Sequence, residues 1–328
     1  MMKMRKWHCM AFFLLLVCCH TAYAKGAAEP DKKTILLPNG ESYAYLEQGE
    51  GAPQTEQEAI LLLHGNTASS LHFLPLFGRI KNARLVAPDM RGFGDSSCNE
   101  GFSSLDELAE DVKLFADALG ISRAHIVGWS TGGGVALILA AKYPELVQSL
   151  FIIQGVSYRG IPVFKSSSGG VNVPYESKEE LAATRGMATM LAALRNKDEN
   201  IMNLIWKAGI YTHKKPPAKD NRVYIAESLK QQNLIDVYWA LMHFNMSGEH
   251  NGYSEGAGTI FAIRCPVTFT CALLDKVIAP AIVRENAAAI AGSKVLEYAK
   301  SGHSPMVDLP DRLANDILFH LQNYMRGI

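Results

Sequence analysis

Short apolar runs alternate along the chain with longer segments whose apolar residues recur at helical spacing. The run Ala59–Leu63 is continuous and apolar, as expected of a buried strand, and Ala124–Val127 ends a second such run. We predict further strands at Thr34–Leu37, Tyr43–Glu47, Arg84–Ala87, Ser149–Ile153, Val267–Leu273 and Val295–Tyr298. Asn39-Gly40, between the first two of these, predicts a β-hairpin. We predict helices at Leu71–Ile80, Ser104–Leu119, Thr131–Tyr143, Pro280–Ala291 and from Pro310 to about Tyr324. Strands that alternate with helices indicate an α/β fold, with a mostly parallel sheet covered on both faces.

The alternation stops between residues 155 and 263, which favour helices and loops. Ligands of parallel sheets bind at the carboxyl ends of the strands, and this insertion joins two strands. We therefore expect it to form a helical cap over that edge. The predicted organisation is a core of residues 34–154 and 264–328, a cap or lid of residues 155–263, and a flexible lead-in of residues 25–33.

The N-terminus has the pattern of a secretory signal peptide. Basic residues precede the apolar run Cys9–Cys19, and Ala22-Tyr23-Ala24 forms an A-x-A cleavage site. We expect residues 1–24 to be removed and the mature protein to be periplasmic or secreted. No stable membrane anchor is expected, because the apolar run is much shorter than the about 20 residues that span a bilayer.

The mature chain would carry 29 basic and 32 acidic residues, a net charge of −3. This charge gives no support to a nucleic-acid partner. Its three cysteines, Cys98, Cys265 and Cys271, cannot all pair internally, so we expect free thiols rather than a disulfide framework or a metal cluster. The reactivity of Cys98 and the oligomeric state are left open.

The segment Gly128-Trp129-Ser130-Thr131-Gly132 is a G-x-S-x-G sequence placed between a predicted strand and a predicted helix. A sharp turn there projects the serine hydroxyl, and the two glycines leave room where strand and helix backbones crowd together. The helix that follows directs its positive end toward any oxyanion formed at the turn. Ser130 is therefore the candidate nucleophile.

A nucleophilic serine needs a base, and the base needs a third group that fixes its tautomer. Asp275 follows the strand predicted at Val267–Leu273, and His303 follows the one predicted at Val295–Tyr298. Both side chains would leave the sheet at the same edge as Ser130. The order Ser, Asp, His is the one expected of an enzyme with such a nucleophile turn.

The oxygen of a tetrahedral intermediate needs amide donors. We expect these to be the backbone N–H groups of Thr131, after the nucleophile, and of Asn66, in the loop after Ala59–Leu63. His64 precedes Gly65, and we interpret it as a structural residue that shapes this loop.

The charged, glycine-rich segment from Asp89 to Ser96 is interpreted as a tight loop held by arginine–carboxylate and backbone hydrogen bonds. The sequence has neither a complete dinucleotide fingerprint nor a phosphate-binding loop, and no H-E-x-x-H zinc motif. No cofactor and no metal are expected.

These segments together resemble the α/β-hydrolase superfamily. Its landmarks are matched in order by H-G-N-T at 64–67, D-M-R-G-F-G-D-S at 89–96, G-W-S-T-G-G at 128–133, the Asp275 loop and G-H-S-P at 302–305. The resemblance runs roughly from Thr34 to the C-terminus. It implies that Ser130 is the nucleophile, His303 the base and Asp275 the orienting acid, with Asn66 and Thr131 as oxyanion donors.

The resemblance also bears on the reaction. Epoxide hydrolases and haloalkane dehalogenases of this fold use an aspartate nucleophile, so Ser130 disfavours those chemistries. The H-G-N and G-W-S-x-G-G pair is similar to that of some short poly(3-hydroxybutyrate) depolymerases.

Candidates for the wall of a substrate pocket are Trp129, beside the nucleophile, and Tyr238 and Met242 in the cap. Leu234, Val237, Tyr238, Leu241 and Met242 recur at helical spacing, so simple packing on the core is the alternative for the cap residues.

The predicted function is that of a serine hydrolase, most readily a carboxylic ester hydrolase acting on small-molecule esters through an acyl-enzyme. The preference for esters rests on the apolar cap and on the frequency of esterases in the family. A peptidase, a carbon–carbon bond hydrolase or an acyltransferase with the same triad remains an alternative, as does a non-catalytic binding protein on the same scaffold.

Overall fold

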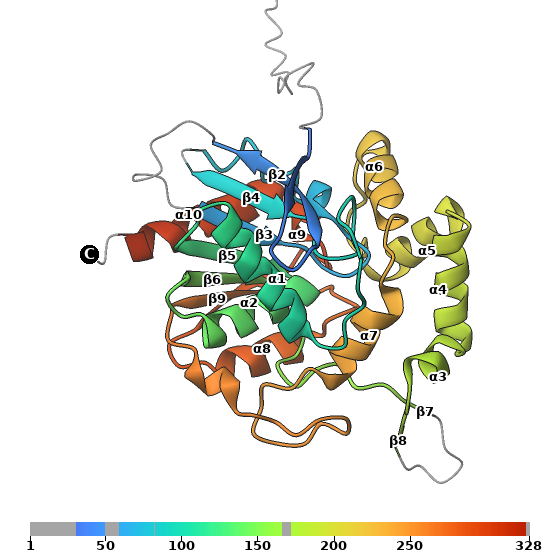
Figure 1. Ribbon diagram of the computed structural model, residues 1–328. Coiled ribbons are helices and arrows are strands. Elements are labelled where there is room, and N and C mark those ends of the chain that lie inside the picture. The colour runs from blue at the N-terminus through green and yellow to red at the C-terminus, as the bar shows by residue number, and fades with distance from the viewer. Residues whose placement is uncertain (1–30, 50–58, 82, 166–171, 326–328) are drawn as a thin grey trace, which may run out of the picture. The chain divides into compact units, whose positions relative to one another are not determined.

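A computed structural model describes residues 31–49, 59–81, 83–165 and 172–325 of the chain (Figure 1). The expected signal peptide and most of the expected lead-in lie outside these residues. Within the described ranges, the structure has no helix that is both long enough and apolar enough to cross a bilayer.

Among the described residues, the core is an eight-stranded sheet in the order β1-β2-β4-β3-β5-β6-β9-β10. The strands are β1 (Lys33–Leu36), β2 (Ser42–Gln48), β3 (Ala59–Leu63), β4 (Arg84–Pro88), β5 (Ala124–Trp129), β6 (Val147–Ile153), β9 (Val267–Ala272) and β10 (Lys294–Tyr298). β2 pairs antiparallel with both β1 and β4, and all other neighbours are parallel. The predicted mostly parallel α/β sheet is therefore confirmed, and so is the hairpin around Asn39-Gly40.

Helices cover both faces of the sheet, which explains why its central strands are apolar throughout. Successive side chains of a strand point to opposite faces. Leu61 and Leu63 accordingly pack in one buried cluster with α1 (Leu105–Ala118), α2 (Thr131–Lys142) and α8 (Pro280–Ala288). Ile60 and Leu62 pack in a second cluster with α9 (Pro305–Asp308) and α10 (Pro310–Met325).

The helix predicted over Leu71–Ile80 is wrong. The segment forms only the short 3-10 helix η1 (Ser70–Phe73) followed by turns. Pro75 cannot supply the N–H that a helix needs. Gly78 has φ +79°, which is incompatible with a right-handed helix. Apolar spacing reflects burial here rather than helical periodicity.

The insertion between β6 and β9 is mostly helical (Figure 1). It contains the strand pair β7 (Phe164–Lys165) and β8 (Val173–Pro174), then α3 (Lys178–Ala182), α4 (Arg185–Arg195), α5 (Glu199–Gly209), α6 (Ala218–Ser228), α7 (Leu234–His243) and η2 (Thr259–Ala262). Figure 1 shows α3 to α7, yellow-green to orange, grouped beside the sheet. Val237 and Leu241 of α7 share the buried cluster of α1 and α2, so this part of the insertion is continuous with the core.

The N-terminal boundary of the ordered core lies slightly earlier than expected. β1 begins at Lys33, and Lys32 is already half-buried, although both residues fall in the predicted flexible lead-in.

Candidate active site

Ser130 lies in a strained turn between β5 and α2. Its backbone has φ 54° and ψ −118°, a combination that non-glycine residues rarely adopt and that is concentrated at functional sites. A Cβ atom added to Gly132 would lie 2.2 Å from the carbonyl oxygen of Leu63, and one added to Gly128 would lie 2.5 Å from that of Gly132. The two glycines of the G-x-S-x-G sequence are therefore required by backbone crowding.

The structure brings the predicted acid and base into contact. Nδ1 of His303 lies 2.7 Å from Oδ2 of Asp275, and both side chains are buried. Oδ1 of Asp275 accepts hydrogen bonds from the N–H groups of Val277 and Ile278, at 2.7 and 3.0 Å. The carboxylate is therefore fixed on one side by the backbone and on the other by the imidazole. With Nδ1 engaged, Nε2 is the nitrogen left to exchange a proton with a nucleophile.

Trp129 links the nucleophile turn to this pair. Its indole N–H donates a 2.8 Å hydrogen bond to the backbone carbonyl oxygen of His303. The centres of the two rings are 5.7 Å apart. The residue next to Ser130 thus supports the loop that carries the candidate base.

Asp308 fixes the other side of the His303 loop, a role that no sequence motif indicates. Its Oδ2 accepts the N–H of Gly302 at 2.7 Å and the hydroxyl of Ser301 at 3.1 Å. Its Oδ1 accepts the N–H of Lys214, at 2.8 Å. In the sequence, only its place five residues after His303 could have pointed to Asp308. An acidic residue at such a distance is too common to be informative alone.

The loop after β3 lies directly against Ser130. A Cβ added to Gly65 would come within 2.9 Å of the Cβ of Ser130. The backbone N–H groups of Asn66 and Thr131 find no acceptor within the part of the chain that the structure describes. Both remain available as the oxyanion donors that the sequence predicted.

His64 has the structural role predicted for it. Its ring is fully buried, Nδ1 lies 2.8 Å from the carbonyl oxygen of Gly65, and Nε2 accepts the N–H of Met90 at 3.0 Å. Nδ1 is therefore the donor. Burial lowers the pKa of His64, which favours this neutral form.

The loop from Asp89 to Ser96 is also held as predicted. Arg91 forms a buried two-pronged pair with Asp111 of α1, with Nε–Oδ2 and Nη2–Oδ1 distances of 2.7 and 2.6 Å. Ser96 donates its hydroxyl to the carbonyl oxygen of Asp89 at 2.6 Å.

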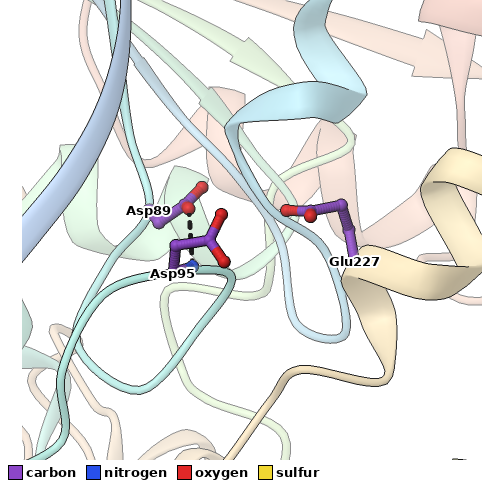
Figure 2. A group of neighbouring side chains, drawn as sticks. All are labelled: Asp89, Asp95 and Glu227. Atoms are coloured by element: carbon purple, nitrogen blue, oxygen red, sulfur yellow. Dashed lines mark hydrogen bonds between the residues drawn. The ribbon is translucent and has the colours of Figure 1, made fainter. Parts of the chain in front are cut away.

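Three carboxylates near this loop have the spacing of a metal site. Figure 2 shows Asp89 and Asp95, from the loop after β4, facing Glu227 of α6. Lys32, however, places its Nζ 2.7, 2.7 and 2.5 Å from oxygens of Asp89, Asp95 and Glu227. Burial alone would lower the pKa of Lys32, but these carboxylates raise it above its ordinary value. The cluster is a charge network around an ammonium group, so the residues do not fit a metal ion.

The predicted pocket residues are wholly or partly buried. Trp129 and Met242 are 1% and 0% exposed, so neither offers a surface to a substrate in this structure, and we assign Trp129 instead to support of the His303 loop. Tyr238 is partly buried, with its hydroxyl 3.8 Å from Sδ of Met190.

A cavity of about 400 Å³ lies between α1, the end of α2 and the end of α7, and its lining includes none of Ser130, Asp275 and His303.

An aromatic cluster joins the insertion to the core beside the candidate triad. His72 stacks between Trp206 and Tyr224, with ring centres 5.0 and 4.7 Å away, and Trp206 is 6.3 Å from Trp129. Nδ1 of His72 accepts the N–H of Ser69, so its proton is on Nε2. Burial lowers the pKa of His72 to about 3. His72 is thus a packed, neutral core residue.

Comparisons with known proteins agree with this fold. A family model described as the alpha/beta hydrolase fold matches residues 58–310. Lipase 1 of Psychrobacter immobilis is 25% identical over 303 residues, which cover 90% of this chain and 85% of that protein. A hydrolase from Pseudomonas aeruginosa is structurally similar, with a TM-score of 0.69 and 20% identity over 89% of this chain and 98% of that one. An esterase from Exiguobacterium antarcticum has a TM-score of 0.66 and 18% identity, covering 88% and 98%.

Proposed function

The chain belongs to the alpha/beta hydrolase fold family, and from this premise we propose that it is a serine hydrolase that cleaves small-molecule carboxylic esters. The observation that carries the proposal is the 2.7 Å contact between His303 and Asp275. The loop of His303 is in turn hydrogen-bonded to Trp129, which precedes Ser130 in the strained turn. A binding protein would not need a buried acid–base pair whose histidine loop is hydrogen-bonded to a strained serine turn. The similarity to Lipase 1 of Psychrobacter immobilis supports an ester as the substrate class.

In the proposed mechanism, Nε2 of His303 removes the proton of Ser130 as its hydroxyl oxygen attacks the ester carbonyl carbon. Asp275 keeps the Nδ1 proton in place and stabilises the imidazolium that forms. The N–H groups of Asn66 and Thr131 donate to the oxyanion, at the positive end of α2. The imidazolium then protonates the leaving alcohol, and an acyl-enzyme remains.

The second half of the reaction repeats these steps with water. Nε2 of His303 removes a proton from water, the oxygen attacks the acyl carbon, and Ser130 leaves with its proton restored. We also propose, from the N-terminal residue pattern alone, that the enzyme acts in the periplasm or outside the cell.

Hydrolysis of p-nitrophenyl esters of increasing acyl length tests the proposal, with the wild type beside Ser130→Ala. We expect turnover that depends on Ser130 and has an optimum chain length. Full activity in Ser130→Ala would rule out the assignment. Reaction of Ser130 with a fluorophosphonate but with no ester would keep the serine hydrolase and exclude the ester substrate.

A further inference from the structure

Gln231 connects the cap to the loop that carries the oxyanion donor Asn66. Its side chain is buried in the connection between α6 and α7. Its Nε2 donates to Oδ1 of Asn66 at 2.8 Å, and its Oε1 accepts the N–H of Thr67 at 3.2 Å. One primary amide therefore satisfies a donor and an acceptor of the same turn.

The turn that Gln231 contacts needs external support. Thr67 has φ 53°, in the left-handed region that a β-branched residue rarely occupies, so the conformation is strained. The local interactions are few: Oδ1 of Asn66 also accepts the N–H of Thr67, at 2.9 Å. Relaxation of this strain would shift both peptide groups that flank Asn66, including the Gly65–Asn66 peptide that carries the Asn66 N–H.

Gln231 is itself held rigidly. Its Nε2 also donates to Oδ1 of Asn233, at 2.9 Å, while Nδ2 of Asn233 donates to the carbonyl oxygen of Arg91. The backbone N–H of Gln232 donates to the carbonyl oxygen of Gly92 at 2.8 Å. Upstream, Glu227 is tied to the core through Lys32. The segment from Glu227 to Asn233 is thus anchored on both sides of Gln231.

We propose that Gln231 is a positioning residue, supplied by the cap, that holds the Asn66–Thr67 turn so that the Asn66 N–H is directed at the oxyanion. The inference rests on the proposed serine hydrolase function. Because the oxyanion exists only in the transition state and intermediate, loss of this support lowers kcat rather than raising KM. A misplacement of the donor by about 1 Å is enough to cost up to about 100-fold in rate.

The test compares Gln231→Met, which keeps the length of the side chain without its amide, with Gln232→Met. Gln232 is exposed, and its side chain has no hydrogen-bond partner among the described residues, so it is the matched control. We expect kcat on a p-nitrophenyl ester to fall about 10- to 100-fold in Gln231→Met, with KM within about twofold of wild type. Gln232→Met should behave as wild type, and urea unfolding checks that both variants are folded.

Gln231→Glu adds a readout that a purely structural role would not give. An ionised glutamate keeps the acceptor for the Thr67 N–H but places a negative charge against Oδ1 of Asn66, whereas the protonated form can donate to it. The rate of Gln231→Glu relative to wild type should therefore rise as the pH falls from 7 to 5. A ratio independent of pH would contradict the positioning role, even if Gln231→Met proved unstable.

Fluorophosphonate labelling separates this inference from the function on which it rests. Phosphonylation of Ser130 also places negative charge on an oxygen, so its rate should fall in Gln231→Met even where no ester is turned over. Equal labelling or turnover in Gln231→Met and Gln232→Met, or a change confined to KM, would overturn the inference. No labelling of the wild type would contradict the proposed function itself, and the positioning role with it.

Discussion

The indole N–H of Trp129 donates to the backbone carbonyl oxygen of His303 at 2.8 Å, across 174 residues of sequence. The residue before the candidate nucleophile therefore orients the loop of the candidate base. The end of β5 thus leads into the turn of Ser130 and also supplies, through Trp129, a hydrogen bond to the His303 loop. A single strand therefore couples the positions of Ser130 and His303.

Trp129→Phe should remove this hydrogen bond while keeping most of the buried ring. We expect kcat to fall about 10-fold, because the His303 loop loses one of its fixed points, and the free energy of unfolding to fall by about 1–3 kcal/mol. Ester kinetics and urea unfolding measure the two effects. Trp239→Phe in α7 is the matched control, and equal kcat in both variants would refute the support role.

Asp275→Asn should be a nearly inactive but folded variant. The amide would present N–H₂ to Nδ1 of His303 and favour the wrong tautomer, so we expect kcat to fall by about 10⁴-fold. The exposed Asp311→Asn serves as the control. Turnover by Asp275→Asn within about tenfold of wild type would show that Asp275 is not the orienting acid.

Stability should depend on the protonation of His72. Its pKa is lowered by burial from 6.5 to about 3, so below pH 6.5 the unfolded chain binds a proton that the folded chain does not. Unfolding is therefore favoured progressively as the pH falls from about 6.5 toward 3. His72→Phe should lose less stability between pH 7 and pH 5 than wild type, by about 2 kcal/mol.

Urea unfolding of both proteins at pH 7 and pH 5 measures this difference. The exposed His213→Phe is the control for the loss of a histidine. An equal loss of stability on acidification in wild type and His72→Phe would show that His72 is not the group responsible.

Lys32→Met should destabilise the fold through the carboxylates it leaves behind. The side chains of Asp89 and Glu227 are 0% and 5% exposed. Glu227 would keep its ion pair with Lys230, at 2.5 Å, but the buried carboxylate of Asp89 would lose its ammonium partner. We expect a loss of about 3 kcal/mol in the free energy of unfolding. Lys113→Met, which breaks an exposed pair with Asp117, should cost less than about 1 kcal/mol. A similar cost for both variants would mean that the network around Lys32 contributes little.

Much of the fold was predictable from local patterns. Continuous apolar runs identified β3 and β5, Asn39-Gly40 identified the hairpin, and the loops after β9 and β10 placed Asp275 and His303 at one edge. These features depend on periodicity and chain order, which a single sequence displays. The helix over Leu71–Ile80 was wrong because apolar spacing outweighed Pro75 and Gly78 in the prediction.

The supporting contacts were not predictable in this way. Gln231 contacts Asn66 from 165 residues away, and Lys32 contacts Glu227 from 195 residues away. Such pairings depend on how the cap docks on the core, which no local pattern encodes. Trp129 looked like a pocket residue because it adjoins Ser130, yet its burial and its bond to His303 give it a supporting role.

Mass spectrometry of the protein after reaction with a fluorophosphonate tests the central claim most directly. We predict a single covalent adduct on the peptide that contains Ser130, formed at neutral pH and lost in Ser130→Ala. Formation should also be slowed by several orders of magnitude in His303→Ala, because the base that activates the hydroxyl is absent. An unmodified Ser130, or an adduct that forms equally fast without His303, would contradict the assignment of these residues as a catalytic nucleophile and its base.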